Sequence, residues 1–466
     1  MWTLNKLADY SGGKLINGYG EIEVKGFSID SRMVKDGDLF IALKGERTDG
    51  HYFLKDALKK GASACLVENE KYNQEDLETG QAIIEVNNSL EALKMIAMKH
   101  REQYNVKVIG ITGSVGKTTT KDMVAEVLRQ NYKVLKTEGN LNTGIGLPLT
   151  LLNLNELHEV IVLEMGMRQM GEIAELCRIA RPDIGIITNV AESHLENLKT
   201  IENIAKAKGE LLEGLANDGV AIINGDDERV VRLQSKAPNR VVSYGTGVDA
   251  NLVIKDIKPR QERIECLLEH RPKGEENEKV KMSLNFPGKH NLMNAMAALL
   301  AGVELNVSLT KGVENLKNFY PTDMRNQIFT GKKDITVIND TYNANVKSTK
   351  AALDILSDVA TNRKVAILGD MYELGDYTDD AHLEVGEYVA SKEVEVIIAV
   401  GDKAKLIKDG ALNAGLNNDN VLFYNNKEEL IKQIQGILKP GDTILVKGSR
   451  GMALEDVVYA IIDEEG

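Results

Sequence analysis

From about residue 106 onward, the chain repeats one pattern: a short apolar run, a turn containing Gly or Asp, and then an amphipathic stretch. The apolar runs are almost continuously hydrophobic, which is typical of strands buried on both faces of a parallel sheet. Strands that alternate with helices favour doubly wound α/β sheets. We predict an α/β protein with strands at Val106–Thr112, Val160–Glu164, Ile184–Thr188, Val220–Asn224, Lys364–Leu368, Val394–Val400 and Thr443–Val446.

Two changes in this pattern indicate three domains. In the first hundred residues we predict short strands at Glu21–Phe27 and Asp38–Ala42, and few long helices. Near Asn318–Arg325, one of only eight prolines follows a helical pattern, and a helix usually ends before a proline. We expect a small α/β domain, a central doubly wound domain with a phosphate loop, and a C-terminal Rossmann-like domain, at 1–105, 106–322 and 323–466.

Length and composition agree with this division and exclude several classes. A chain of 466 residues holds about three domains at roughly 150 residues each. The net charge of −13 argues against a nucleic-acid or anionic-membrane partner, because the mean field repels phosphate polymers. The three cysteines lie far apart with no metal-binding spacing, and no apolar run reaches the ~20 residues that span a bilayer. We expect a cytoplasmic monomer without a membrane span.

A glycine-rich run, VIGITGSVGKTT, connects the first of these strands to a helical pattern. It departs from the strict phosphate-loop pattern because Ile111 holds the position of the first glycine. Glycines let backbone N–H groups turn inward, and the helix N-terminus adds partial positive charge, so phosphates bind there. We expect Lys117 to neutralise the outer phosphates and Thr118 to ligate Mg²⁺. The expected ATP-binding residues of the loop are Gly113, Ser114, Val115, Gly116, Lys117, Thr118 and Thr119.

Polar residues at two further strand ends point to the same edge of the sheet. Glu164 closes one strand, and His194 follows another by a few residues. Ligands bind at the carboxyl edge of open α/β sheets, and acids there commonly reach a metal. Glu164 could instead be an exposed strand end, and His194 could have a structural role.

Lys208 falls on the apolar face of a predicted helix, four residues after Ile204. A bare ammonium there is costly unless its stem snorkels to solvent or it finds a partner. A buried lysine also has a lowered pKa and is nucleophilic. It can then react with CO₂ to give a carbamate that binds metal. The residues alone leave both interpretations open.

Several motifs together resemble the Mur ligases, the ATP-dependent amide-forming enzymes of peptidoglycan precursor synthesis. The resemblance covers nearly the whole chain. The motifs that carry it are SIDSR, GDLFIALKGERTDGH, TGSVGKTTTK, GNLNTGIGLPLTLL, EMG, NVAESHLE, AKAKGE, PGKHNLMNAMAA, MR, DTYNANVKS, LGDMYELG and VKGSR.

The resemblance implies roles for residues in each domain. It implies a uridine-nucleotide pocket in the first domain, with further substrate contacts in the GNLNTG segment; Thr143 stands there where the family often has a second Asn. These substrate-binding candidates are Ser31, Arg32, Lys44, Gly45, His51, Asn140, Asn142 and Thr143.

For ATP and Mg²⁺, the resemblance implies metal contacts from Thr118, Glu164, His194 and a carbamylated Lys208. His290, Asn291 and Asn294 resemble the residues on the adenine side, while Arg325 and Asp340 resemble groups that reach phosphate and ribose. The expected catalytic residues are Lys117, Glu164, His194, Lys208 and Arg325.

The implied reaction joins D-Ala-D-Ala to UDP-MurNAc-tripeptide through an acyl phosphate, at the expense of ATP. The YNAN and GDMxELG motifs favour this member. A sister ligase that adds lysine or diaminopimelate typically carries DNPR and KGHE, and neither is present. A folylpolyglutamate synthase, or a nucleotide switch without ligase activity, would also carry a phosphate loop; the DSR and GDLFIAL segments favour a UDP-sugar over folate.

Overall fold

The computed structural model describes residues 2–72, 81–260, 263–272, 274 and 276–462. Its contacts divide the chain into two compact units. Residues 1–108, 135–165 and 175–181 form the first, and residues 109–134, 166–174 and 182–466 form the second. None of the described helices has the length and hydrophobicity needed to cross a bilayer.

The first unit begins with a five-stranded mixed sheet. Its strands are β2 (Lys14–Ile16), β4 (Gly26–Ser28), β5 (Asp38–Ile41), β6 (Ala64–Glu68) and β7 (Ala82–Val86), and three helices accompany it: α1 (Leu4–Ser11), α2 (Leu54–Lys59) and α3 (Ser89–Arg101). The strand order is β2-β7-β6-β5-β4, and β2 alone runs antiparallel to its neighbour. Phe40, Cys65 and Ile83 contribute to a buried core on this sheet.

The prediction of one strand over Glu21–Phe27 is wrong. The segment contains two strands in different sheets: β3 (Glu23–Val24) pairs with β1 (Trp2–Thr3), and β4 pairs with β5. The break falls at Lys25, whose N–H donates to the carbonyl of Gly37 at 2.8 Å. The chain therefore changes partners there, which hydrophobic periodicity does not reveal.

The remaining elements of the first unit surround one strand that carries a candidate site residue. That strand is β10 (Val160–Glu164), and the elements around it are β9 (Val134–Lys136), α5 (Gly146–Leu151) and α6 (Glu172–Ala180). Every residue of β10 is buried, which explains its unbroken apolar sequence. Glu164 therefore lies at the buried end of a core strand.

The second unit continues with parallel strands and an antiparallel extension. The strands are β8 (Lys107–Thr112), β11 (Ile184–Ile187), β12 (Val220–Asn224), β13 (Arg240–Gly245), β14 (Leu252–Pro259), β15 (Ile264–His270) and β16 (Glu278–Leu284). Within this unit the strands lie in the order β16-β15-β14-β13-β12-β11-β8. Ile184 of β11 is in register with Ile109 of β8, so both strands end near the phosphate loop.

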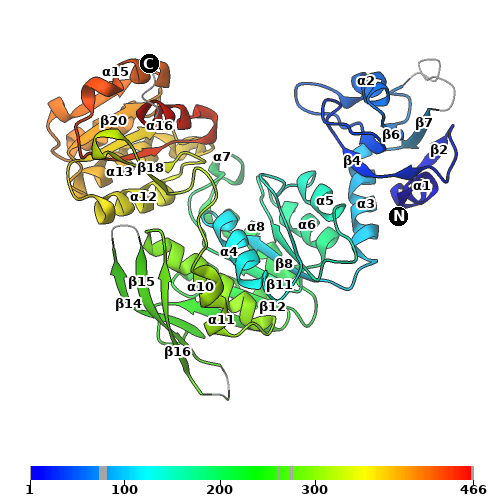
Figure 1. Cartoon of the computed structure of the whole chain (residues 1–466), viewed down its shortest axis with the longest axis horizontal. Helices are drawn as coiled ribbons and strands as arrows, with labels where there is room; N and C mark the ends of the chain where they lie inside the picture. The colour runs from blue at the N-terminus through cyan, green and yellow to red at the C-terminus, as the bar shows by residue number, and fades with distance from the viewer. Residues whose placement is uncertain (1, 73–80, 261–262, 273, 275, 463–466) are drawn as a thin grey trace. The chain divides into compact units, whose positions relative to one another are not determined.

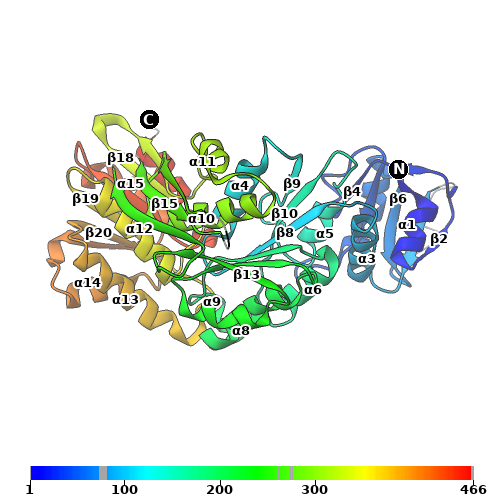
Figure 2. The ribbon, with the colours of Figure 1, turned by 90° about the horizontal axis from the view of Figure 1, so that it is seen from below.

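Helices cover this part of the sheet, and two of them lie side by side in both views (Figures 1 and 2). These two are α4 (Lys117–Leu128) and α10 (Lys289–Glu304). The others are α7 (Leu195–Leu198), α8 (Ile201–Glu213), α9 (Glu228–Arg232) and α11 (Leu309–Leu316). Eleven of the sixteen residues of α10 are buried, since it packs as a core helix.

The C-terminal part of the second unit is a six-stranded sheet with helices on both faces. Its strands are β17 (Gln327–Thr330), β18 (Thr336–Asp340), β19 (Lys364–Gly369), β20 (Val396–Val400), β21 (Val421–Tyr424) and β22 (Thr443–Lys447); its helices are α12 (Val346–Val359), α13 (Thr378–Ser391), α14 (Lys405–Asn413), α15 (Lys427–Ile437) and α16 (Glu455–Ile462). The order is β17-β18-β22-β19-β20-β21, and β17 alone is antiparallel.

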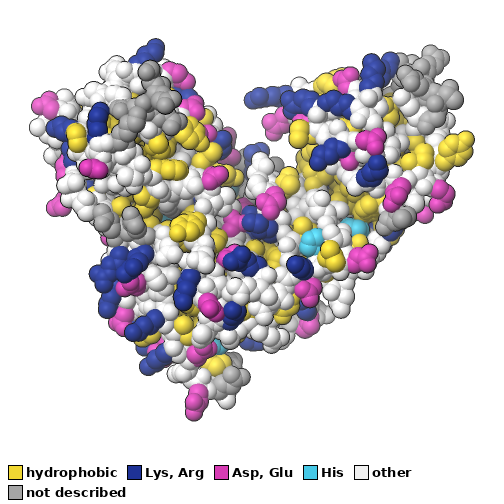
Figure 3. Space-filling model, viewed as in Figure 1, with side chains coloured by type: hydrophobic (Ala, Val, Ile, Leu, Met, Phe, Trp, Pro, Cys, Tyr) yellow, Lys and Arg dark blue, Asp and Glu magenta, His cyan; other side chains and the backbone are white. Residues whose placement is uncertain are grey.

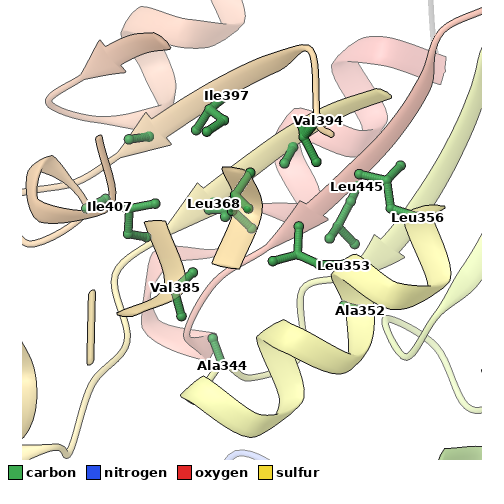
Figure 4. Packing of buried hydrophobic residues seen from close by; sticks show 14 of the residues in the cluster. Ala344, Ala352, Leu353, Leu356, Leu368, Val385, Val394, Ile397, Ile407 and Leu445 are labelled. Atoms are coloured by element: carbon green, nitrogen blue, oxygen red, sulfur yellow. The ribbon is translucent and has the colours of Figure 1, made fainter. Parts of the chain in front are cut away.

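Two apolar cores hold that sheet. Leu353 of α12, Val385 of α13 and Ile407 of α14 pack on one face, as Figure 4 shows. Leu430 of α15 and Val458 of α16 pack on the other. Each such side chain contributes about 1.5–3 kcal/mol when fully buried. The predicted α/β fold class and all seven predicted strands are confirmed; two strands match their predicted ends, and the other five differ by one or two residues.

Candidate active site

The phosphate loop connects β8 to α4 through two glycines with positive φ. Gly113 has φ 151° and Gly116 has φ 88°. A Cβ at Gly113 would lie 1.8 Å from Oγ1 of Thr188, and one at Gly116 would lie 2.5 Å from Oδ1 of Asn294. Both the backbone conformation and the close neighbours therefore require glycine. The departure at Ile111, which is buried in β8, does not alter the loop itself.

The end of β11 fixes this loop by hydrogen bonds. The carbonyl of Val115 accepts from Oγ1 of Thr188 at 2.7 Å and from Nδ2 of Asn189 at 2.8 Å. In return, Oδ1 of Asn189 accepts from the Val115 N–H at 3.1 Å, and its carbonyl accepts from the Ser114 N–H at 3.0 Å. Asn189 was not among the predicted site residues, yet it determines where the loop backbone lies.

Lys117 and Thr118 begin α4, where the helix dipole favours bound anions. The Lys117 ammonium donates to the carbonyl of Gly113 at 2.8 Å. The Thr118 hydroxyl accepts from Nη2 of Arg325 at 2.9 Å. The structure thus brings Arg325, which precedes β17, to the phosphate loop; its predicted contact with ATP stays a prediction.

Arg325 is held by an aromatic ring that sequence reasoning missed. Its guanidinium carbon lies 4.0 Å from the ring centre of Tyr342, so the cation faces the π-system. The Nε of Arg325 is buried without a hydrogen-bond partner in the described part of the chain. An unsatisfied buried donor beside the phosphate loop suits an anionic ligand.

Asp340 ends β18 and meets a buried lysine. Its Oδ2 lies 2.5 Å from Nζ of Lys447, which also donates to the carbonyl of Asn343 at 2.9 Å. The other carboxylate oxygen accepts from the N–H of Asn326 at 3.3 Å. Lys447 belongs to the VKGSR motif, but only the fold places it beside Asp340, because β18 and β22 are neighbouring strands.

His290 lies near the same group, while the two predicted asparagines face the interior. Nδ2 of Asn326 approaches Nε2 of His290 at 3.4 Å, and burial lowers the pKa of His290. Asn291 donates to the carbonyl of Pro287 at 2.8 Å, and Oδ1 of Asn294 accepts from Thr120 at 3.3 Å. Asn291 and Asn294 therefore anchor α10 and α4; their predicted contact with adenine stays a prediction.

His194 meets a carboxylate from the C-terminal sheet. Its Nδ1 lies 2.6 Å from Oε2 of Glu373, in the loop after β19. Both residues have left-handed backbones, with φ 56° for His194 and φ 64° for Glu373. The close contact with His194 lowers the pKa of Glu373. Strained backbone of this kind is common at functional sites.

Lys208 is buried on α8 with 1% of its surface exposed. Burial lowers its pKa well below the usual value, and the nearby charge of Lys117 adds to the shift. The side chain does not reach bulk solvent, so the snorkelling interpretation is wrong. What remains is a buried lysine whose pKa is lowered and which lies near a second lysine. Lysine is nucleophilic in its uncharged form, which a lowered pKa favours.

Glu164 lies in the first unit, at the end of β10. The residue is 3% exposed. Its Oε1 accepts from Nδ2 of Asn142 at 2.8 Å, and the backbone N–H of Glu164 donates to Oγ1 of Thr137 at 3.0 Å. Asn142 is thus tied to the predicted metal ligand, while Asn140 and Thr143 are exposed in the same segment. The exposed strand end considered from the sequence is not what the structure contains.

The candidate pocket of the N-terminal sheet mixes buried and exposed residues. His51 has its Nδ1 2.5 Å from Oδ1 of Asp49, and its Nε2 accepts from the Glu68 N–H at 2.9 Å. Both ring nitrogens are therefore engaged, so His51 shapes this loop from inside. Ser31 is buried, whereas Arg32, Lys44 and Gly45 are exposed.

The described residues contain no cluster of three or more His, Cys, Asp or Glu that could hold a metal alone. Mg²⁺ is usually held by one or two carboxylates together with substrate phosphates and waters. The hydroxyl of Thr118 at the start of α4 is an oxygen donor of the kind that such a partly substrate-built site uses. The residues present therefore fit a magnesium–nucleotide complex.

Fold and site together define a multidomain α/β protein of the nucleotide-binding class. Three family models match the chain in sequence order. They are "Mur ligase family, catalytic domain" at residues 23–101, "Mur ligase middle domain" at 111–302 and "Mur ligase, glutamate ligase domain" at 324–450. The chain belongs to the Mur ligase family.

Curated relatives and solved structures agree. The chain is 37% identical to the UDP-N-acetylmuramoyl-tripeptide–D-alanyl-D-alanine ligase of Bacillus subtilis, over 99% of this chain and 98% of that one. It is 33% identical to the ligase of the same name from Escherichia coli, over 98% of both. A crystal structure of MurF from Acinetobacter baumannii matches with TM-score 0.89 at 29% identity, over 99% of this chain and 98% of that one. The MurF ligase of Thermotoga maritima in complex with ADP matches with TM-score 0.82 at 28% identity, over 94% and 97%.

Proposed function

We propose that this chain is an ATP-dependent ligase that joins D-Ala-D-Ala to UDP-MurNAc-tripeptide in peptidoglycan precursor synthesis. The observation that carries the proposal is similarity over 95% or more of the chain to several curated ligases of this specificity. The phosphate loop and the Arg325 contact supply the chemistry that such a reaction needs. We keep 1–105, 106–322 and 323–466 as the proposed substrate, ATP and C-terminal domains.

The chemical problem is a poor leaving group. A carboxylate does not condense with an amine at neutral pH, so the terminal carboxylate of the tripeptide first attacks the γ-phosphate of ATP. This step forms an acyl phosphate and ADP. The neutral amine of D-Ala-D-Ala then attacks the acyl carbon, the C–O bond to phosphate breaks, and an amide and inorganic phosphate result.

The residues of the phosphate loop meet the electrostatic demand of the first step. All of its reactants are anionic, so gathered positive charge is the main source of catalysis. Lys117, Arg325 and the N-terminus of α4 supply that charge. Correct alignment of carboxylate and γ-phosphate contributes up to ~7–11 kcal/mol more.

Mg²⁺ is the proposed metal, with Thr118, Glu164, His194 and Lys208 as the residues that would hold it. When bound, it neutralises phosphate charge and polarises the transferring group. Lys208 would first react with CO₂, its nitrogen bonding to carbon and losing a proton, to become an anionic carbamate. Its burial, lowered pKa and position near Lys117 favour that reaction.

For the other substrates, we propose that Ser31, Arg32, Lys44 and Gly45 contact the uridine nucleotide. We propose that the adenosine part of ATP contacts His290 and Asp340, and that Lys447 holds the Asp340 carboxylate. We propose that the peptide end of the substrate lies near Asn140, Asn142 and Thr143. Asn142 would act indirectly, by its hydrogen bond to Glu164.

The test is phosphate release from ATP with purified protein, combined with mass spectrometry of the product. We expect release only when UDP-MurNAc-tripeptide and D-Ala-D-Ala are both present, and a product heavier by one dipeptide minus water. Release with UDP-MurNAc-dipeptide and lysine or diaminopimelate would instead identify the sister ligase. ATP hydrolysis that ignores both substrates would favour the nucleotide switch.

A further inference from the structure

The LGDMYELG motif, residues 368–375, sends one acidic side chain to the ATP-binding sheet. That side chain is Glu373, which follows β19 and reaches Nδ1 of His194 at 2.6 Å. The adjacent Tyr372 and Met371 are held instead by their own sheet: the Tyr372 N–H donates to Ser449, and the Met371 N–H donates to His382. The backbone of the motif is therefore anchored within the C-terminal part of the unit, while the carboxylate of Glu373 points toward His194.

The backbone on both sides of this contact is unusual. His194 and Glu373 are both non-glycine residues with positive φ, a conformation that is unfavourable for a residue with a side chain. Their loops also meet directly, because the Glu196 N–H donates to the carbonyl of Glu373 at 3.4 Å. A Cβ at Gly375 would lie 3.0 Å from Cα of Glu196, so a glycine permits the approach.

The chemistry of the pair determines what the histidine presents. Nδ1 of His194 lies within ion-pair distance of the Glu373 carboxylate and has no other hydrogen-bond partner among the described residues. A proton held on Nδ1 by that carboxylate leaves the lone pair of the ring at Nε2. Histidines that bind metals usually donate their other N–H to a carboxylate or carbonyl in this way, which fixes both the tautomer and the ring orientation.

We propose that Glu373 is the positioning residue that sets the Nδ1–H tautomer of His194, and that it makes the metal-binding form of this histidine depend on docking of the C-terminal sheet. The inference rests on the proposed function. Glu373 had no predicted role in the site, and it belongs to the same proposed C-terminal domain as Arg325, which contacts Thr118. By linkage, a bound metal–nucleotide complex then favours docking by the same factor with which docking favours metal binding.

A second ion pair between the same two sheets provides a matched control. Nζ of Lys347 on α12 lies 3.7 Å from Oδ2 of Asp227, the residue before α9. It bridges the sheets as the Glu373 pair does but does not contact His194. A Lys347→Ala change therefore removes an equivalent contact without altering the imidazole.

The first measurement uses the metal-free full chain with ¹⁵N-labelled histidine and NMR of the ring nitrogens. Seven histidines are present, and a His194→Asn variant identifies the signal. We expect wild type and Lys347→Ala to carry the proton on Nδ1. Glu373→Ala should shift His194 towards a mixture of tautomers, and Glu373→Gln, which keeps an acceptor without charge, should fall between them. An unchanged tautomer in Glu373→Ala would overturn the proposal, whatever the enzyme catalyses.

The second measurement is the affinity for Mn²⁺ in the presence of ADP, by electron paramagnetic resonance. We expect about a 10–100-fold loss in Glu373→Ala, a smaller loss in Glu373→Gln and none in Lys347→Ala. Equal affinity in Glu373→Ala and wild type would refute the positioning role while leaving the ligase assignment intact. If His194→Asn also bound Mn²⁺ as wild type does, the proposed metal site itself would be wrong.

Discussion

The phosphate loop and the candidate uridine pocket differ in how their residues are held. In the loop, Val115 alone takes part in three hydrogen bonds to the end of β11, and two glycines fit against neighbouring side chains. In the pocket, Arg32 has 85% of its side chain exposed, and among the described residues its guanidinium pairs with Asp30 alone, two residues away. A site for phosphoryl transfer needs preorganised dipoles, because reorganisation during the reaction costs rate. A site that only retains a substrate needs less rigidity.

The distribution of charge on the surface does not explain how the anionic substrates are bound. Lys and Arg are interspersed with Asp and Glu on the face shown in Figure 3, with no large area of one sign. Binding of the anionic substrates therefore depends on local groups such as Lys117 and Arg325.

The largest expected effect is at Lys208. Lys208→Met keeps an apolar side chain of similar length and removes the cost of a buried amine, so the melting temperature should not fall. Turnover should drop by about 10²–10³-fold or more, because an anion needed for charge balance is lost.

Lys208→Ala supplies the matched comparison. Lys208→Ala should be as inactive as Lys208→Met. Short carboxylates such as formate should partly restore the activity of Lys208→Ala, because the shorter side chain leaves a space that methionine fills in Lys208→Met. Initial rates at increasing formate concentration measure this. Full activity in either variant would contradict the carbamate assignment.

A pair of glycines separates backbone strain from steric fit. Gly116 and Gly171 share φ 88°, but a Cβ at Gly116 meets Asn294 at 2.5 Å, whereas one at Gly171 meets nothing within 4 Å. Gly171→Ala should cost about 1–2 kcal/mol of unfolding free energy. Gly116→Ala should cost roughly 1–3 kcal/mol more and weaken ADP binding. Chemical denaturation and calorimetric titration check both; equal losses would mean that the loop tolerates a side chain.

In the N-terminal sheet, His51→Phe tests whether the pocket is shaped from inside. The change removes the ring contact to Asp49 and leaves the Glu68 N–H without its acceptor, which should cost about 1–3 kcal/mol of unfolding free energy. KM for the uridine nucleotide should rise while kcat changes little. A loss confined to kcat would place His51 in the chemistry instead.

The smallest effect is expected for Arg32→Ala. The side chain is exposed, so the melting temperature should stay the same. KM for the uridine nucleotide should rise about tenfold, as expected when one charged hydrogen bond to a ligand is lost. Steady-state kinetics measure this, and an unchanged KM would remove Arg32 from the pocket.

Local patterns predicted the parts of this molecule that are local. The buried strands and the loop from Gly113 to Thr118 are continuous in sequence, and Lys208 could be placed on an apolar helix face. Contacts between distant segments could not be predicted in the same way. The Lys447–Asp340 pair spans 107 residues, and the Glu373–His194 pair requires two loops with positive φ. His51 was assigned to a ligand because its motif resembles a family pocket, although its ring is used within the protein.

The most direct test of the account is the fate of the carboxylate oxygen. UDP-MurNAc-tripeptide labelled with ¹⁸O in its terminal carboxylate is incubated with ATP, D-Ala-D-Ala and the enzyme, and the released phosphate is analysed by mass spectrometry. If the carboxylate attacks the γ-phosphate, each phosphate released carries one ¹⁸O atom. Phosphate without label, accompanied by ADP, would mean that water receives the phosphoryl group and that the chain does not ligate through an acyl phosphate.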